Sequence, residues 1–208
     1  MPFLPRSRSL IAPVLAPVLA PVLVLGLAAA GLAGCTGAVV GGAAATGVAA
    51  YQERGITGAA KDLRISAEIQ ELWLRTDHKM LVDVGIEVYG GRVLLTGVVP
   101  NEDMRAQAVK LAWTVSGVQE VINEIQIGED GIVDLARDTW ITTQLKSKIT
   151  FDGEIASINY FIETVNGSVY LLGVARNQAE LDRVIAHAKS IEYVRKVVSH
   201  VKLIGAAT

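Results

Sequence analysis

The sequence has few of the residues that build disulfides and metal sites. Its 208 residues include one cysteine, Cys35, and three histidines. A single cysteine excludes a disulfide within the chain, so each folded domain must depend on an apolar core. The histidines His78, His187 and His200 are scattered, and no cysteine or carboxylate cluster stands near them at metal-ligand spacing. We therefore expect no metal site, no cofactor, and surface positions for all three histidines.

The chain also lacks an excess of positive charge and the common catalytic motifs. It has 19 Lys and Arg against 21 Asp and Glu, so no global basic field is present to attract nucleic acid. No glycine-rich phosphate loop stands between a strand and a helix. Glu87 and Glu163 each fall on a predicted strand of their own domain, and nothing in the spacing requires them to meet as an acid–base pair. We expect a protein without enzymatic activity; a hydrolase is the remote alternative.

A long apolar run is confined to the N-terminus. Arg6 and Arg8 precede an uncharged segment from Leu10 to Cys35 with a threefold APVL repeat. Its prolines disfavour a spanning helix, so we interpret residues 1–34 as an export signal that is removed. The mature chain would keep 174 residues, with 17 basic against 21 acidic ones. Residues 35–60 are rich in Gly and Ala and predict a flexible or partly ordered tether.

The end of the apolar run resembles a bacterial lipobox. The residues are Leu32-Ala33-Gly34-Cys35, and the resemblance implies that Cys35 is acylated, with palmitate among its acyl groups, and becomes the first residue of the mature chain. Thr36 in place of an aspartate then implies sorting to the outer membrane. The alternative is that Cys35 is an unmodified thiol.

The rest of the chain is a tandem repeat. Shifted by 76 residues, the sequence aligns with itself without gaps over residues 61–127. The matched pairs include Asp62 and Asp138, Glu87 and Glu163, Gly91 and Gly167, and Gly97 and Gly173. We therefore expect two domains of the same fold, at residues 61–130 and 134–204.

Each copy alternates helix and strand patterns. We expect Asp62 or Asp138 to cap a first helix with apolar residues at helical spacing. Two alternating strands then flank a Gly-Gly or Asn-Gly turn, which supplies the positive backbone angles of a tight hairpin. A second amphipathic helix begins near Asn101 or Asn177, and a last strand ends the copy. The predicted class is α+β, helix-strand-strand-helix-strand, with both helices covering one face of a three-stranded sheet.

The first helix of the second copy has two different faces. On a helical wheel, Ile141, Leu145 and Ile149 lie within about 80° of one another and define the core side. Trp140 lies about 100° away on the opposite side, so we expect its indole to point out of the core. The equivalent outward positions of the first copy hold Ala60, Arg64, Ala67 and Glu71, a solvated face.

An outward tryptophan has two explanations. It can pack between the two domains, as large aromatics often do. It can also face a membrane, because indole settles at headgroup depth while nearby Lys and Arg attract anionic lipid.

Two such copies, each with a glycine-containing hairpin turn and a glycine closing the second strand, resemble BON domains. With the lipobox and the DTWITT segment that starts at Asp138, the chain is similar to dual-BON outer-membrane lipoproteins of Gram-negative bacteria. In that family the corresponding helix of the second domain is implicated in binding anionic phospholipid. The resemblance implies lipid-binding roles for Trp140, Ile141, Thr143, Lys146 and Ser147, and further along for Thr150 and Phe151. The wheel places Ile141 largely on the core side.

The resemblance implies a lipid-anchored outer-membrane protein that faces the periplasm. It would bind membranes containing phosphatidylglycerol-like lipid through its second BON domain and support envelope integrity, including at division sites. The first domain would act as structural support or dock envelope proteins. The alternative function is a periplasmic protein-binding adaptor, at the envelope or the division site, without direct lipid recognition.

Overall fold

The computed structural model describes residues 52–128 and 135–205. The expected signal at 1–34, Cys35 and the first part of the tether lie outside the described residues. The described residues of both repeats belong to one compact unit. Within the described ranges, no helix is both long and apolar enough to cross a membrane.

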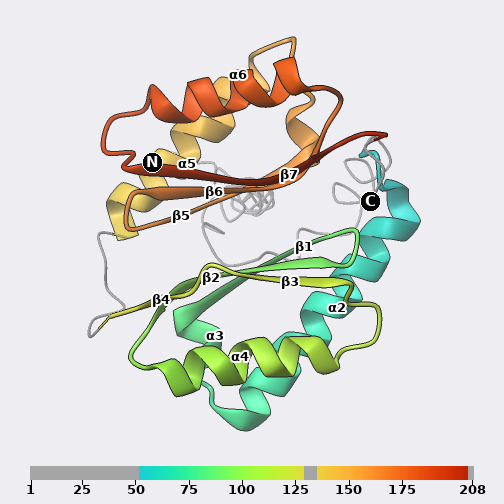
Figure 1. The fold of residues 1–208 in the computed structure, drawn as a ribbon, viewed down its shortest axis with the longest axis vertical. Coiled ribbons are helices and arrows are strands. Elements are labelled where there is room, and N and C mark those ends of the chain that lie inside the picture. The colour runs from blue at the N-terminus through green and yellow to red at the C-terminus, as the bar shows by residue number, and fades with distance from the viewer. Residues whose placement is uncertain (1–51, 129–134, 206–208) are drawn as a thin grey trace, which may run out of the picture. The chain divides into compact units, whose positions relative to one another are not determined.

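Both repeats have the expected order of elements (Figure 1). The first consists of α2 (Gly55–Thr76), α3 (Met80–Asp83), β1 (Val84–Tyr89), β2 (Arg92–Val99), α4 (Glu102–Thr114), β3 (Glu120–Asn123) and β4 (Gln126–Ile127). The second consists of α5 (Leu135–Thr150), η1 (Ser157–Asn159), β5 (Tyr160–Val165), β6 (Ser168–Ala175), α6 (Gln178–Lys189) and β7 (Lys196–Leu203). The α+β prediction is confirmed, with two differences: each repeat adds a short helix before its first strand, and the last strand of the first repeat is divided into β3 and β4.

The two sheets have the same topology. In the first, β1 pairs antiparallel with β2, and β2 pairs parallel with β3 and β4. In the second, β5 pairs antiparallel with β6, and β6 pairs parallel with β7. Helices α4 and α6 begin next to Asn101 and Asn177, as expected. Both asparagines cap their helices, because each side chain accepts a hydrogen bond from the backbone N–H three residues later, 2.9 Å away in both.

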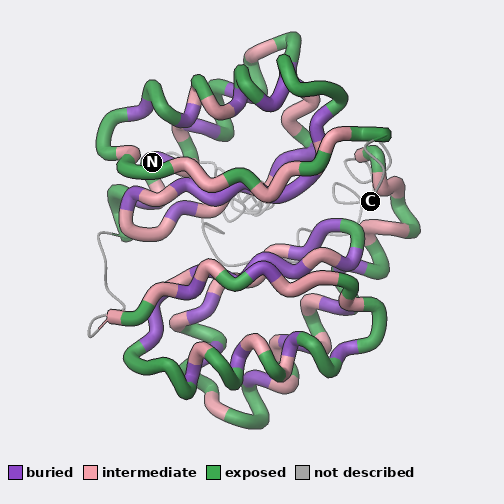
Figure 2. Tube along the Cα trace, viewed as in Figure 1, coloured by how far each residue is buried: buried purple, intermediate pink, exposed green. Residues whose placement is uncertain are grey.

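Each repeat has a core between its two long helices and one face of its sheet, as Figures 1 and 2 show. In the first repeat the core contains Ile69, Trp73 and Leu95, and in the second it contains Ile141, Leu145 and Leu171. These residues have no exposed surface. The helical periodicity read from the sequence therefore identified the buried faces correctly.

Asp62 and Asp138 do not cap their helices, so that prediction was wrong. Both helices begin earlier along the chain, and both aspartates are buried within them. Each carboxylate instead accepts two hydrogen bonds from the backbone of the hairpin turn in its own repeat. Asp62 binds the N–H groups of Gly90 and Gly91, each at 2.8 Å, and Asp138 those of residues 166 and 167, at 2.7 and 2.8 Å. The aspartates tie the first helix of each repeat to the hairpin.

The expected tether also ends earlier than predicted. Residues 55–60, which were predicted to belong to a flexible or partly ordered tether, form the first turns of α2. The preceding Arg54 explains part of this order, because its guanidinium pairs with buried Asp62 and donates to the carbonyl of Val88 at 2.9 Å. An ion pair and a backbone contact of this kind hold the start of α2 against β1.

The two repeats contact each other through the sheet faces that their helices leave uncovered. Tyr89, Leu94 and Ile122 of the first repeat form one buried cluster with Tyr170 and Leu172 of the second. The rings of Tyr89 and Phe161 meet edge to face, with centroids 6.1 Å apart.

Polar contacts lie around this cluster. Arg92 donates to the carbonyl of His200 at 2.8 Å, and the His200 ring lies 2.9 Å from the carboxylate of Glu124. Asn166 donates to the side chain of Gln126 at 2.9 Å. The repeats therefore share an apolar interface with polar contacts at its margin.

Candidate functional site

Helix α5 has one buried and one exposed side. Ile141, Leu145 and Ile149 are at most 1% exposed, so they anchor the helix on the core of the second repeat. Trp140 is 41% exposed and Phe151, directly after the helix, is 86% exposed. The expectation that Trp140 points out of the core is confirmed. Because 3.6 residues make one turn, the exposed residues Ala136, Trp140, Thr143, Ser147 and Phe151 follow one line along the helix; we call them the α5 stripe.

The neighbours of Trp140 belong to the second repeat. Its ring meets that of Tyr193 edge to face, with centroids 6.1 Å apart. The guanidinium of Arg137 lies 4.9 Å from the centre of the same Tyr193 ring. Trp140 is not among the residues that form the cluster between the repeats. The geometry therefore disfavours the explanation that this tryptophan packs between the domains.

The structure separates the other residues implied by the resemblance into three groups. Thr143 and Ser147 lie in the α5 stripe, and Thr150 is exposed at the end of the helix. Ile141 has no exposed surface, so its side chain is not available to lipid, and its inclusion among the lipid-binding side chains is corrected here. Lys146 is exposed but lies on another side of α5, where its charge acts on Glu87 and Glu163.

The same positions of the first repeat have a different chemistry. The positions equivalent to Trp140 and Phe151 in the first repeat hold Arg64 and Arg75. Both form ion pairs along α2, Arg64 with Glu68 at 2.6 Å and Arg75 with Glu71 at 2.5 Å. Exposed pairs at this spacing are typical of a solvated helix face. The α5 stripe has no charged residue, so the two copies have diverged at this surface.

The charges of Glu87 and Glu163 interact, which the spacing in the sequence did not require. Neighbouring residues Ile86 and Ile162 pack on the two cores, so strand alternation turns both glutamates to the opposite sheet faces, where the repeats touch. The pKa of Glu87 is raised to about 7, mainly by burial and then by the charge of Glu163, while the charges of Lys146 and Arg54 oppose the shift. Burial also raises the pKa of Glu163, with Lys146 opposing.

Of the three histidines, which were all expected at the surface, only His78 is fully exposed; His187 and His200 are partly buried. His78 is exposed, and His187 lies 2.8 Å from the carboxylate of Asp152. Hydrogen bonds from His187 and Arg183 hold the pKa of Asp152 well below its usual range. In the described part of the chain, no group of three or more His, Cys, Asp or Glu is arranged to hold a metal ion.

Sequence reasoning missed Tyr193, whose ring contacts Trp140, and Arg195, two residues further along the chain. Both line a hollow of about 170 Å³ together with Arg137 and the 166–167 turn. Tyr193 aligns with Gly117 of the first repeat, and Arg195 with Gln119. Aligning the two copies position by position would therefore have revealed both residues as differences between the repeats.

Known proteins resemble this chain over most of its length. The model of the BON domain family matches residues 61–129 and 137–205. The outer membrane lipoprotein DolP of Haemophilus influenzae is 34% identical over 171 residues, which cover 80% of this chain and 87% of that protein. A protein of Anaplasma centrale, described as an uncharacterized protein in the gshII 5' region, is 41% identical over 128 residues, 61% of this chain and 85% of that one.

A more distant relative is the osmotically-inducible protein Y of Escherichia coli. It is 28% identical over 144 residues, which cover 68% of this chain and 72% of that protein. The family match accounts for both repeats and for their common topology. The chain belongs to the BON domain family and carries two copies of the domain.

Proposed function

We propose that this protein is an outer-membrane lipoprotein that faces the periplasm and binds anionic phospholipid through the α5 stripe of its second BON domain. The observation that carries the proposal is the contrast between the two first helices. Trp140 and Phe151 lie in an uncharged exposed line on α5, whereas Arg64 and Arg75 form ion pairs at the same positions of α2. A duplicated helix that has exchanged charges for exposed aromatics fits a membrane interface better than bulk water.

The energetics of this surface suit weak, reversible contact. Each Lys or Arg close to an anionic membrane contributes on the order of 1 kcal/mol. An inserted aromatic adds a few kcal/mol at about 25 cal/mol per Å² of apolar surface. Arg137 stands beside the stripe to provide such a charge. Weak contacts suffice when a lipid anchor already holds the protein at the bilayer, because the anchor raises the effective concentration of the site.

The anchor is assigned to Cys35, the cysteine of the lipobox-like segment, with signal cleavage after residue 34. The similarity to an outer membrane lipoprotein over 80% of the chain supports this assignment. The expected roles are support of envelope integrity and enrichment at sites with anionic lipid, including the division site. The first BON domain supports the second through the shared interface and offers its own surface to envelope proteins.

Co-sedimentation with vesicles tests the proposal. Residues 36–208, which include both cores, are mixed with phosphatidylcholine vesicles with or without phosphatidylglycerol. We expect binding only when phosphatidylglycerol is present. Equal binding to both vesicles, or binding to neither, would support the protein-binding adaptor instead.

The substitution Trp140→Glu makes the test specific to the stripe. It places a negative charge where the proposal requires an aromatic at the anionic surface, so vesicle binding and envelope localisation should both be lost. The midpoint of thermal unfolding should stay close to that of the wild type, because the ring lies outside the core. A large fall in that midpoint would mean that the indole is needed for packing, which contradicts its assigned role.

A further inference from the structure

Tyr193 adopts a backbone conformation that is unfavourable for its side chain. Its φ is 67°, in the left-handed region, which bulky residues rarely enter because Cβ crowds the backbone. The equivalent position of the first repeat is Gly117, with φ of 97°. Glycine has no such penalty. The second repeat therefore keeps a tyrosine at a position where its own duplicate shows that glycine fits.

Packing in the core does not explain this tyrosine. Its side chain is 52% exposed, and its ring contacts Trp140 and Arg137 on the surface. A strained residue that persists without a core role points to a function at the surface. Tyr193 widens the aromatic area next to the α5 stripe from a second, separate element of the chain.

The loop that carries Tyr193 also differs in charge between the repeats. Gln119 and Glu120 of the first repeat correspond to Arg195 and Lys196 of the second. Glu192 adds one negative charge to the same loop, and its hydrogen bond raises the pKa of the Tyr193 hydroxyl. The second repeat therefore has two cations where the first has a neutral side chain and a carboxylate, and Arg137 adds a third at a position where the first repeat also has a cation, Lys61.

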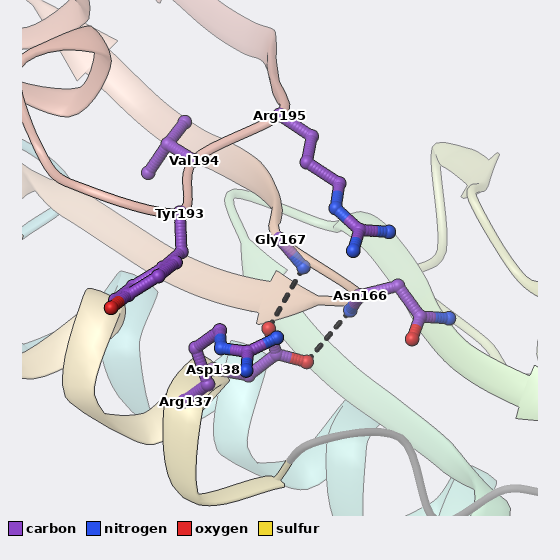
Figure 3. Close-up of a pocket in the computed structure, with 7 residues that line it drawn as sticks. All are labelled: Arg137, Asp138, Asn166, Gly167, Tyr193, Val194 and Arg195. Carbon is purple, nitrogen blue, oxygen red and sulfur yellow. Dashed lines mark hydrogen bonds between the residues drawn. The ribbon is translucent and has the colours of Figure 1, made fainter.

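The hollow of about 170 Å³ lies between these groups. In Figure 3, Tyr193 and Arg137 border it on one side and Arg195 and Asn166 on the other. Asp138 also lines it, but its carboxylate accepts two backbone hydrogen bonds from the turn and is 6% exposed. Its charge is directed into the turn, and the other charged side chains of the lining are those of Arg137 and Arg195.

We propose that this hollow binds the phosphate of an anionic phospholipid headgroup, with Arg137 and Arg195 as donors, while Tyr193 enters the membrane interface beside Trp140. The inference rests on the proposed membrane-binding function and assigns it a headgroup site. Guanidinium groups suit the role because they donate paired hydrogen bonds to phosphate oxygens. Tyrosine suits the neighbouring position because its ring is apolar and its hydroxyl tolerates water.

Two substitutions that restore the residues of the first repeat test the site. Arg195→Gln should weaken binding to phosphatidylglycerol vesicles about fivefold, the effect expected for one cation at an anionic surface. Tyr193→Gly should weaken it several-fold, because the ring no longer enters the interface. The same variant relieves the backbone strain, so its thermal midpoint should be equal to that of the wild type or higher. Weaker binding by a protein that is not less stable separates a surface role from a structural one.

The control is Lys110→Gln, which removes an exposed cation from α4 of the first repeat and should leave binding unchanged. If wild-type protein binds and Trp140→Glu does not, but Tyr193→Gly and Arg195→Gln bind like wild type, the headgroup site is wrong and the α5 stripe stands. No binding by the wild type would reject both. If Lys110→Gln weakened vesicle binding as much as Arg195→Gln, binding would depend on the overall positive charge of the protein, and the headgroup site would be wrong. Inorganic phosphate that binds as tightly as the vesicles would reject the lipid as the ligand.

Discussion

Glu87 on β1 and Glu163 on β5 occupy equivalent positions in the two BON domains and repel each other where the domains meet. Lys146, from α5, and Arg54, before α2, partly compensate the charge of Glu87. Duplication has thus placed two copies of one glutamate at the same interface. We therefore expect the contact between the domains to depend on pH.

The pH dependence of stability follows from Glu87. Its pKa rises from the ordinary 4.5 to about 7 in the folded protein. Between these values the folded state binds more protons than the unfolded state, so the free energy of unfolding falls as pH rises from about 4.5 to 7. The loss should reach a few kcal/mol at most. Glu87→Gln should flatten this dependence and be more stable than wild type at pH 8, measured by urea unfolding across pH.

Glu154→Gln, a change of an exposed glutamate, is the matched control and should keep the wild-type profile. Identical pH profiles for Glu87→Gln and the wild type would contradict the role of this carboxyl group.

Lys146 should act on stability more than on lipid. Its charge opposes the raised pKa values of both glutamates, so Lys146→Gln should lower the free energy of unfolding at pH 8 by up to about 1 kcal/mol, as for a partly exposed ion interaction. The effect should shrink at pH 5, where Glu87 binds a proton. Lys148→Gln, two residues further along α5, serves as the control in thermal unfolding at both pH values. If Lys146→Gln lost vesicle binding but kept the stability of the wild type, Lys146 would bind lipid, as the family resemblance implies.

Asp138→Ala should be strongly destabilising. The carboxylate accepts hydrogen bonds from the N–H groups of Asn166 and Gly167, and its removal leaves both donors of the turn without this partner. Loss of charged hydrogen bonds of this kind costs about 2 to 3 kcal/mol. Chemical denaturation measures the change, with Asp182→Ala on the exposed side of α6 as the reference. An effect below about 0.5 kcal/mol would mean that the turn forms without the aspartate.

Phe151→Ser should weaken membrane binding without affecting folding. The side chain is 86% exposed, so the midpoint of thermal unfolding should not change. Binding to phosphatidylglycerol vesicles should fall about tenfold if roughly half of the ring's transfer energy is realised. Leu135→Ser is the matched control: it is 72% exposed at the other end of α5 but lies off the stripe. Equal losses for the two variants would argue against a stripe with a defined direction.

Patterns among neighbouring residues in the sequence were enough to predict much of the fold. Periodicity of apolar residues identified the core side of α5 through Ile141, Leu145 and Ile149, and the wheel predicted that Trp140 points outward. The turns with positive φ at Gly90 and Asn166 were recognisable because few residues tolerate that conformation. Such features depend on neighbours in the sequence, so one chain is enough to read them.

The sequence by itself determined the duplication, the α+β order of each copy, the buried helix faces and the outward direction of Trp140. Only the tertiary structure decided that Asp138 binds a turn rather than caps a helix, that the charges of Glu87 and Glu163 interact, and that Tyr193 packs on Trp140. The physical reason is that periodicity reports which side of an element is buried. The partner on that side comes from a distant part of the chain, and only the packing of whole elements brings the two together.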